Sequence, residues 1–383
     1  MIFELAYPHL RSLFFASAAA GLLWLGLANA PARAQDAPLS TIDEDCTAMA
    51  FAPDGRLVYA VRHMVKNRLY DLQRDDIWLL GKDGKRRRLI NGEKVIPASA
   101  SISYSVNGFR WSPGGHLIAV ELDAVAVIDE DGNTRESLMT LLLDDEGKQM
   151  RVGADDAFLS NASDAAWLAD EVTVVFLAEA VKPNLLFSIN SIRPIARRGS
   201  ALFGGRTFVA AAWDARRNLG YAVERDRLFQ GPPRLQRLGL TKDTADELAT
   251  LDGYAGGLTV SPSGNKVAYY VDHEVLEIRD LAAPTQVARM RIGFGVYAWS
   301  PDERRILLKR APEKKTGDLV SFDVPSLNAP ASGTAGAAPA VLEPPAVPLF
   351  HGLLIREFQF APDGHTIATI NPGKRNILIY PMK

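Results

Sequence analysis

Short alternations of apolar with polar or small residues recur along this chain, and each one flanks a tight turn. The stretch FAPDGRLVYA (residues 51–60) holds an aromatic residue, a Pro-Asp-Gly turn and an alternating apolar run, and FQFAPDGHTIATIN (residues 358–371) repeats it. A period of two predicts strands. Because proline fixes φ and glycine accepts a positive φ, each copy predicts a strand, a tight turn and a second strand.

The pattern occurs seven times when the residue at the proline position is taken as an anchor. Two degenerate copies, here called the worn copies, have Ala169 and Ala215 in place of the proline but keep the aromatic residue before it. The anchors lie 39 to 61 residues apart, which suits four-stranded propeller blades. The sequence therefore predicts an all-β fold, a seven-bladed β-propeller of four-stranded antiparallel blades, with six or eight blades as alternatives. The anchors are Pro53, Pro113, Ala169, Ala215, Pro262, Pro301 and Pro362.

A bulky residue, usually aromatic, stands two positions before each anchor. Residues two and four places before an anchor lie on one face of the same strand. We expect this aromatic column to pack between blades. Its members are Phe51, Trp111, Trp167, Trp213, Val260, Trp299 and Phe360.

The seventh unit ends at Lys383 after only three predicted strands, which leaves one sheet edge open. Residues 37–46 precede the first repeat and are free to supply the missing strand. We expect the stretch PLSTI (Pro38 to Ile42) to pair with the strand around residues 377–380. An Ala/Pro-rich stretch, residues 328–348, is expected to form a loop between the sixth and seventh blades.

The N-terminus resembles a secretory signal. Arg11 precedes an apolar run from Ser12 to Ala30, and an Ala32-Arg33-Ala34 cleavage pattern follows. Residues 1–34 are therefore predicted to be a signal peptide and residues 35–383 a single propeller domain, exported to the periplasm or secreted. An uncleaved membrane anchor is the alternative, because the apolar run is near the length that spans a bilayer.

Composition and charge narrow the classes of partner. The formal net charge of the 383 residues is -2, so the chain has no basic excess for nucleic acid. The basic runs at residues 82–88 and 309–315 are interpreted as solvated outer strands and turns, with binding of a polyanion as the alternative. Cys46, the one cysteine of the sequence, follows three carboxylates, which disfavour a thiolate and indicate a structural role.

The five clear copies of the WSPDG-like repeat resemble the WD40-like propeller repeat of the TolB proteins. They also resemble the non-catalytic propeller of the prolyl oligopeptidase and dipeptidyl peptidase families. The resemblance covers nearly the whole predicted mature chain and implies a propeller scaffold whose function lies in its loops. The sequence shows neither the extra N-terminal domain of TolB nor the hydrolase domain of the peptidases, so neither family's activity carries over.

The sequence contains no recognisable catalytic or metal-binding motif. The sequence has no G-x-S-x-G elbow, and HEVLE at residues 273–277 lacks the second histidine of a zinc-protease helix. The DEDGN stretch at residues 129–133 has its glycine at the wrong place for a calcium loop. We therefore predict no catalytic residue, no metal site and no cofactor.

Two functions remain open. The first is a non-enzymatic binding scaffold for a protein or peptide partner in the cell envelope, acting as a monomer. The second is an enzyme or small-ligand receptor with its site at the mouth of the central channel. Polar residues five or six places before the anchors begin the innermost strands and should converge at one mouth, with Gly256, Gly257 and Gly295 leaving room for a ligand. The candidate binding residues are Thr47, Asn107, Ser163, Asp164, Arg356 and Glu357.

Overall fold

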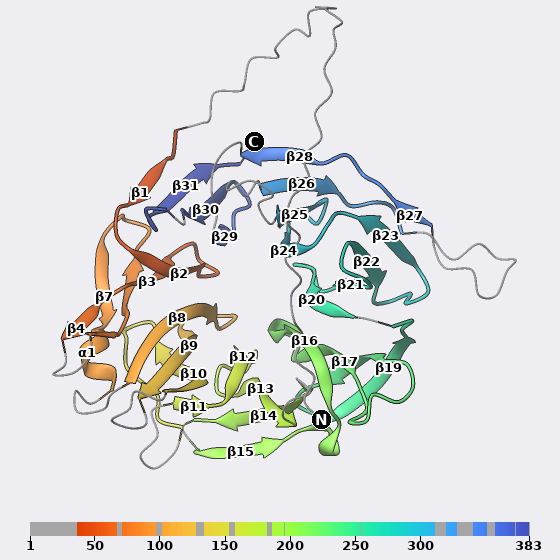
Figure 1. Ribbon diagram of the computed structural model, residues 1–383, viewed down its shortest axis with the longest axis horizontal. Helices are drawn as coiled ribbons and strands as arrows, with labels where there is room; N and C mark the ends of the chain where they lie inside the picture. Colours follow the sequence, from red (N-terminus) through yellow and green to blue (C-terminus); the bar gives the residue numbers. More distant parts are fainter. Residues whose placement is uncertain are drawn as a thin grey trace, which may run out of the picture. The chain divides into compact units, whose positions relative to one another are not determined.

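The computed structural model describes residues 37–382 apart from short gaps, and this part of the chain consists almost entirely of β-strands (Figure 1). The gaps are residues 67–70, 97–101, 128–133, 153–157, 182–185, 195, 254, 311–318, 328–339, 351–356 and 372. The predicted signal peptide (1–34) and Arg356 therefore lie outside the described residues. Across the described ranges, no helix is long and apolar enough to cross a membrane.

The strands form antiparallel sheets that follow one another in chain order (Figure 1). The first sheet holds β2 (Cys46–Phe51), β3 (Leu57–Val61), β6 (Asp76–Leu80) and β7 (Arg86–Ile90). The second holds β8 (Ile102–Trp111), β9 (Leu117–Val127), β10 (Thr134–Asp144) and β11 (Phe158–Ser160).

An eight-stranded sheet comes next, and its two halves meet at the residue pair Phe187 and Phe208. The first half holds β12 (Ala162–Trp167), β13 (Val174–Val181), β14 (Leu186–Arg193) and β15 (Arg198–Ala201). The second half holds β16 (Phe208–Asp214), β17 (Leu219–Glu224), β18 (Arg234–Gly239) and β19 (Thr244–Thr250).

Three further sheets complete the series. The first holds β20 (Gly256–Val260), β21 (Lys266–Tyr270), β22 (Val275–Asp280), β23 (Val287–Arg291) and β27 (Val341–Leu342). The second holds β24 (Gly295–Trp299), β25 (Arg305–Arg310), β26 (Leu319–Asp323) and β28 (Val347–Phe350). The last holds β29 (Glu357–Phe360), β30 (Thr366–Ile370), β31 (Ile377–Pro381) and β1 (Ser40–Ile42).

The remaining elements are short. They are the ribbon of β4 (Met64–Lys66) and β5 (Asp71–Gln73), the helix α1 (Gly92–Val95), and the 3-10 turns η1 (Phe203–Gly205) and η2 (Ala215–Arg217).

The described part of the Ala/Pro-rich stretch departs from the expected connecting loop. Val341 and Leu342 add a parallel fifth strand, β27, to β23, and β28, which begins at Val347, is the outer strand beside β26. Residues 340–348 therefore contribute strands to two sheets. The rest of the stretch, residues 328–339, lies outside the described residues.

The N-terminal strand pairs with the C-terminal strand, as predicted. Ser40 to Ile42 run antiparallel to Ile377 to Ile379, and the N–H of Leu39 donates to the C=O of Ile379 at 2.7 Å. The expectation that residues 38–42 supply the outer strand of the last sheet is confirmed. Both ends of the described chain thus belong to one sheet.

Apolar side chains form seven clusters within the described residues, six between consecutive sheets and one between the two halves of the eight-stranded sheet. One of them joins the last sheet to the first, with Ile377 and Ala368 beside Met49 and Tyr59. Every cluster contains or packs against one member of the aromatic column, so the expected packing between sheets is confirmed. In order of the column, the clusters hold Phe51, Trp111, Trp167, Trp213, Val260, Trp299 and Phe360.

The repeat turns have the predicted geometry. In the first, the N–H of Gly55 donates to the C=O of Ala52 at 2.9 Å, and Gly55 has a φ of 93°. The worn copies keep this shape without glycine, because Glu171 and Asn218 take φ values of 52° and 54°. Successive turns are also hydrogen-bonded to one another. The linked pairs are Arg56 with Gly115, Gly114 with Glu171, Ala169 with Asn218, Arg217 with Gly264, and Ser263 with Glu303.

Removal of β1 is expected to destabilise the protein and promote aggregation. A chain that begins at residue 43 loses Ile42, which is 4% exposed, and leaves the edge of β31 unpaired. Compared with a chain that begins at residue 37, the free energy of unfolding should fall by at least about 2 kcal/mol. Thermal melts and light scattering measure both effects. Equal melting temperatures for the two chains would show that β1 contributes nothing to stability.

Candidate functional site

Five of the innermost strands contain a β-bulge, which lies near the first residue in four of them and in the middle of β8. The register shifts at Thr47 in β2, at Asn107 in β8 and between Ser163 and Ala166 in β12. It shifts again in β16 and, at Gly257, in β20. Bulges re-aim side chains and are common beside binding sites. The columns that the sequence indicated as the channel mouth are therefore the places where the strands depart from regular pairing.

A buried carboxylate fixes the first two bulges. Asp75 is fully buried, and its Oδ2 accepts hydrogen bonds from Thr47 Oγ1 at 2.7 Å and from the N–H of Val106 at 2.9 Å. Its Oδ1 accepts from Gln73 Nε2 at 2.9 Å. Burial raises the pKa of Asp75 above its ordinary value, although these hydrogen bonds oppose the shift. Asp75 thus connects β2 to β8 beside Thr47 and Asn107.

A second buried carboxylate, that of Glu121 on β9, lies near the bulge of β12. Burial raises the pKa of Glu121. Asp75 therefore holds the bulges of two successive sheets, and Glu121 places a second buried carboxylate near a third bulge.

A cavity of about 350 Å³, here called the central cavity, lies between the first strands. It brings together three of the predicted residues, Thr47, Asn107 and Glu357, which come from opposite ends of the chain. Thr47 is only 3% exposed and its hydroxyl is bonded to Asp75, so it supports the wall, whereas Asn107 is exposed. The other lining residues include Val296, Tyr297, Lys309 and Gln359.

Lys309 is a binding candidate that the sequence reasoning missed. It lies on β25, the second strand of its sheet, where it pairs with Val296. The predicted columns contain residues of the innermost strands only, and the repeat pattern gives no indication of function for a residue on a second strand. The ammonium of Lys309, the carboxylate of Glu357 and the amide of Asn107 line the central cavity. The cavity can therefore bind both charged ends of a zwitterion or the terminus of a peptide.

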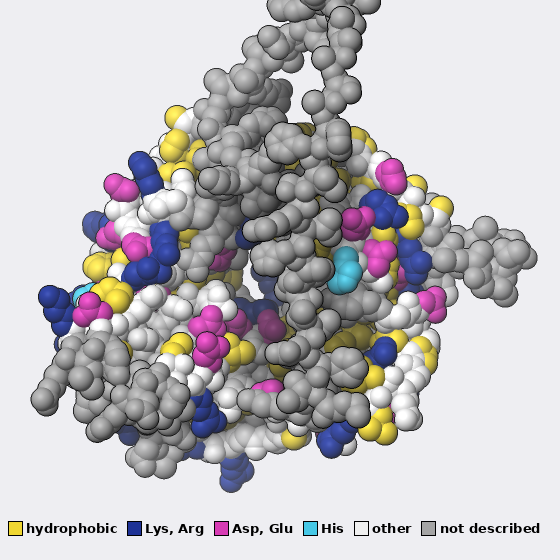
Figure 2. Space-filling view, in the orientation of Figure 1, with side chains coloured by type: hydrophobic (Ala, Val, Ile, Leu, Met, Phe, Trp, Pro, Cys, Tyr) yellow, Lys and Arg dark blue, Asp and Glu magenta, His cyan; other side chains and the backbone are white. Residues whose placement is uncertain are grey.

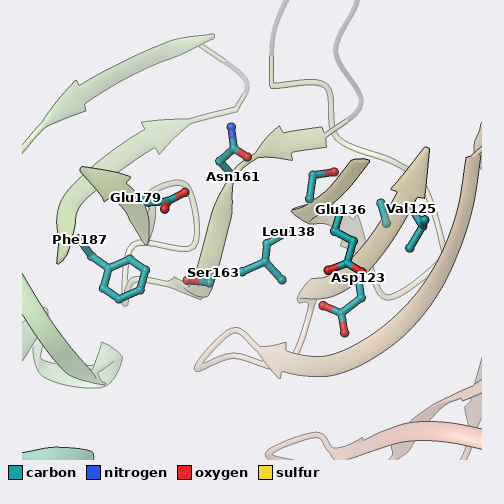
Figure 3. A pocket seen from close by; sticks show the side chains of 10 residues that line it. Asp123, Val125, Glu136, Leu138, Asn161, Ser163, Glu179 and Phe187 are labelled. Carbon is teal, nitrogen blue, oxygen red and sulfur yellow. The ribbon is translucent and has the colours of Figure 1, made fainter. Parts of the chain in front are cut away.

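The remaining predicted residues lie elsewhere. Asp164 forms an ion pair with Arg110 at 2.5 Å, and both line a separate cavity of about 500 Å³ that also reaches Gly257. Ser163 lines a third cavity, between β9–β10 and β12–β14 (Figure 3). Arg356 lies outside the described residues. Whether any of the six binds a ligand stays a prediction.

Gly295 does not leave room for a ligand, contrary to expectation. A Cβ there would lie 2.2 Å from the carbonyl oxygen of Lys309, so the chain's own backbone fills the space. At Gly257, a Cβ would meet the ring of Tyr270 at 3.2 Å, and the residue has a φ of 62°. Close packing and backbone conformation account for glycine at these two positions.

Ion pairs neutralise the first basic run. Arg86 pairs with Glu44 at 2.6 Å and Arg88 with Asp76 at 3.2 Å. Figure 2 shows basic and acidic side chains interspersed over the described surface in view, with no large area of one sign. These observations favour solvated strands over a polyanion site for residues 82–88. The second run lies largely outside the described residues.

Cys46 is a buried free thiol, which agrees with the structural role that its neighbours indicated. It is buried, and burial together with the charges of Glu44 and Asp45 raises its pKa to about 12. In the described ranges, no three His, Cys, Asp or Glu side chains are grouped to hold a metal ion. The absence of metal, cofactor and catalytic residue remains a prediction.

The comparisons with known proteins concern the fold alone. No family model and no curated protein sequence matches the chain. Solved structures do match, among them the crystal structure of the Myceliophteria thermophila Cps50 (Swd1) β-propeller domain, with a TM-score of 0.53 and 13% sequence identity. The match covers 90% of this chain and 100% of that one. The chain therefore has a β-propeller fold, while the resemblance to TolB and the peptidase propellers stays a prediction.

Proposed function

We propose that this β-propeller is a seven-bladed, exported binding scaffold that holds a terminus or charged segment of a partner protein in its central cavity. The count of seven rests on the seven apolar clusters, each between two successive groups of four strands. The eight-stranded sheet counts as two blades because a single residue pair, Phe187 with Phe208, joins its two four-stranded halves.

One observation carries the function. The fold gathers Asn107, Glu357 and Lys309 from three different sheets around one cavity of about 350 Å³. Asp75 holds two of the surrounding strands in bulged conformations, so the wall is preorganised. A preformed cavity with a few polar groups among apolar ones is typical of a binding site.

Export rests on the N-terminal pattern of Arg11, the apolar run and Ala32-Arg33-Ala34. The mature protein should begin at Gln35 and act as a monomer in the periplasm or outside the cell. Mass spectrometry of the N-terminus of protein from the envelope fraction checks the cleavage. A full-length chain in the membrane fraction would instead indicate an anchor.

Site-specific photo-crosslinking tests the function. A photoreactive amino acid at Asn107, in cells that make the protein, should give a discrete crosslinked partner. The matched position is His365, which is also exposed but lies in a repeat turn at the other end of the strands. Crosslinks at position 365 with none at position 107 would place the binding face at the repeat turns and contradict the proposal.

A further inference from the structure

The hairpin of β9 and β10 extends past the apolar core that its sheet shares with the next sheet. Each of these strands has 11 residues, whereas β3 and β21 have 5. Residues near the repeat turn, such as Ala119 and Leu142, pack against Trp167 in the next sheet. The half of the hairpin farther from the repeat turn, here called the outer half, comprises residues 123–127 and 134–138. It continues without that core, so a space opens between it and the next sheet.

One face of this outer half alternates acidic and apolar residues. Leu138 pairs with Asp123 and Glu136 with Val125, which places these four side chains on the same face of the two strands. Leu138 is 45% exposed. The face is therefore apolar and negatively charged at once.

This face forms one wall of a cavity of about 490 Å³, here called the groove. Glu179 and Phe187 form the opposite wall, and Ser163 lies between the two (Figure 3). Burial and the neighbouring charge of Glu136 raise the pKa of Asp123, so a basic group that entered the groove would relieve this repulsion. The groove combines carboxylates on both walls with apolar surface between them.

The edge of β10 beside the groove is open in the described part of the chain. Its partner β11 pairs with residues 139–141, and the N–H of Asn161 donates to the C=O of Leu138 at 2.8 Å. Because alternate residues direct their N–H and C=O to the same side of a strand, Glu136 and Thr134 point theirs outward as Leu138 does. This edge offers hydrogen bonds to a further strand.

We propose that the groove binds an extended, lysine- or arginine-bearing segment of a partner protein, which adds as a strand to the edge of β10. Alternate side chains of that segment face the groove, with basic groups between Asp123, Glu136 and Glu179 and an apolar one on Leu138 and Phe187. Backbone pairing supplies the affinity and the charges supply the specificity. The site rests on the proposed scaffold function and adds a second contact to it.

The test uses the mature protein and the heptapeptide Thr-Lys-Thr-Val-Thr-Lys-Thr, acetylated and amidated so that it carries no charged terminus for the central cavity. Calorimetric titration should show binding, and Glu136→Lys should weaken it by at least about tenfold through like-charge repulsion. Asp123→Asn should weaken it less. A peptide with proline in place of the central valine should lose binding because proline cannot join the ladder.

Lys309→Ala is the matched control, because it alters the central cavity and should leave the affinity for this peptide unchanged. No binding at millimolar peptide, equal binding of a peptide with glutamate in place of lysine, or an unchanged affinity in Glu136→Lys would each overturn the groove site. Crosslinking from position 107 is independent of these measurements, so failure of the groove and failure of the proposed function give different results.

Discussion

Replacement of Trp299 by alanine is expected to lower the free energy of unfolding by about 3–5 kcal/mol. Trp299 is 6% exposed and lies in the cluster between β20–β23 and β24–β28. Its indole N–H donates to Thr259 Oγ1 at 3.1 Å across that interface. The substitution removes a large buried apolar surface, leaves a cavity and takes the donor from Thr259.

Denaturant melts followed by circular dichroism measure the loss. Phe294→Ala serves as the control, because Phe294 is a neighbouring aromatic residue that is 55% exposed, and its loss should cost less than about 1 kcal/mol. If Trp299→Ala also costs less than about 1 kcal/mol, the aromatic column is not the core between blades and the repeat alignment is wrong.

Replacement of Glu277 by alanine is expected to cost about 3 kcal/mol, because it leaves two partly buried arginines without the buried carboxylate that they share. Glu277 is 1% exposed on β22 and accepts charge-assisted hydrogen bonds from Arg279 at 2.5 Å and from Arg289 at 2.8 Å. The hydroxyl of Tyr269 donates to the same carboxylate. Glu277→Gln keeps the shape and should cost less. A cost below about 0.5 kcal/mol for the alanine variant would contradict this role.

The same carboxylate should make stability depend on pH. Burial alone would raise the pKa of Glu277, but the charges of Arg279 and Arg289 and the hydrogen bonds to the carboxylate hold it below its ordinary value of 4.5. A group with a lowered folded pKa stabilises the protein above its unfolded pKa and loses that effect as the pH falls through the folded value. Below pH 4.5 the unmodified protein should therefore lose stability more steeply than Glu277→Gln. Parallel losses would contradict the assignment.

The repeats allowed much of the fold to be predicted. Proline at position 53 and glycine at position 55 have local conformational causes, so they indicate a turn wherever they recur. The pairing of residues 38–42 with β31 followed from an unfinished seventh unit. The worn copies were harder, because Glu171 and Asn218 hold the turn conformation without glycine. There the aromatic residue, which packs between sheets, was the signal that remained.

The site was predicted only in part, and the reason is physical. Thr47, Asn107 and Gly257 occupy bulges but share no residue type, because a bulge is set by pairing with a distant strand. Asp75 fixes two of these strands from a position outside the repeat columns. Lys309 enters the central cavity from a second strand, where the repeat pattern gives no indication of function.

Binding of the partner in the central cavity is tested most directly by the affinity of the crosslinked partner. The purified partner should bind Asn107→Ala and Lys309→Ala at least about tenfold more weakly than the unmodified protein, with melting temperatures unchanged. His365→Ala, in a repeat turn, should bind as the unmodified protein does. Full affinity in both cavity variants, together with a loss in His365→Ala, would contradict the account and assign binding to the repeat turns.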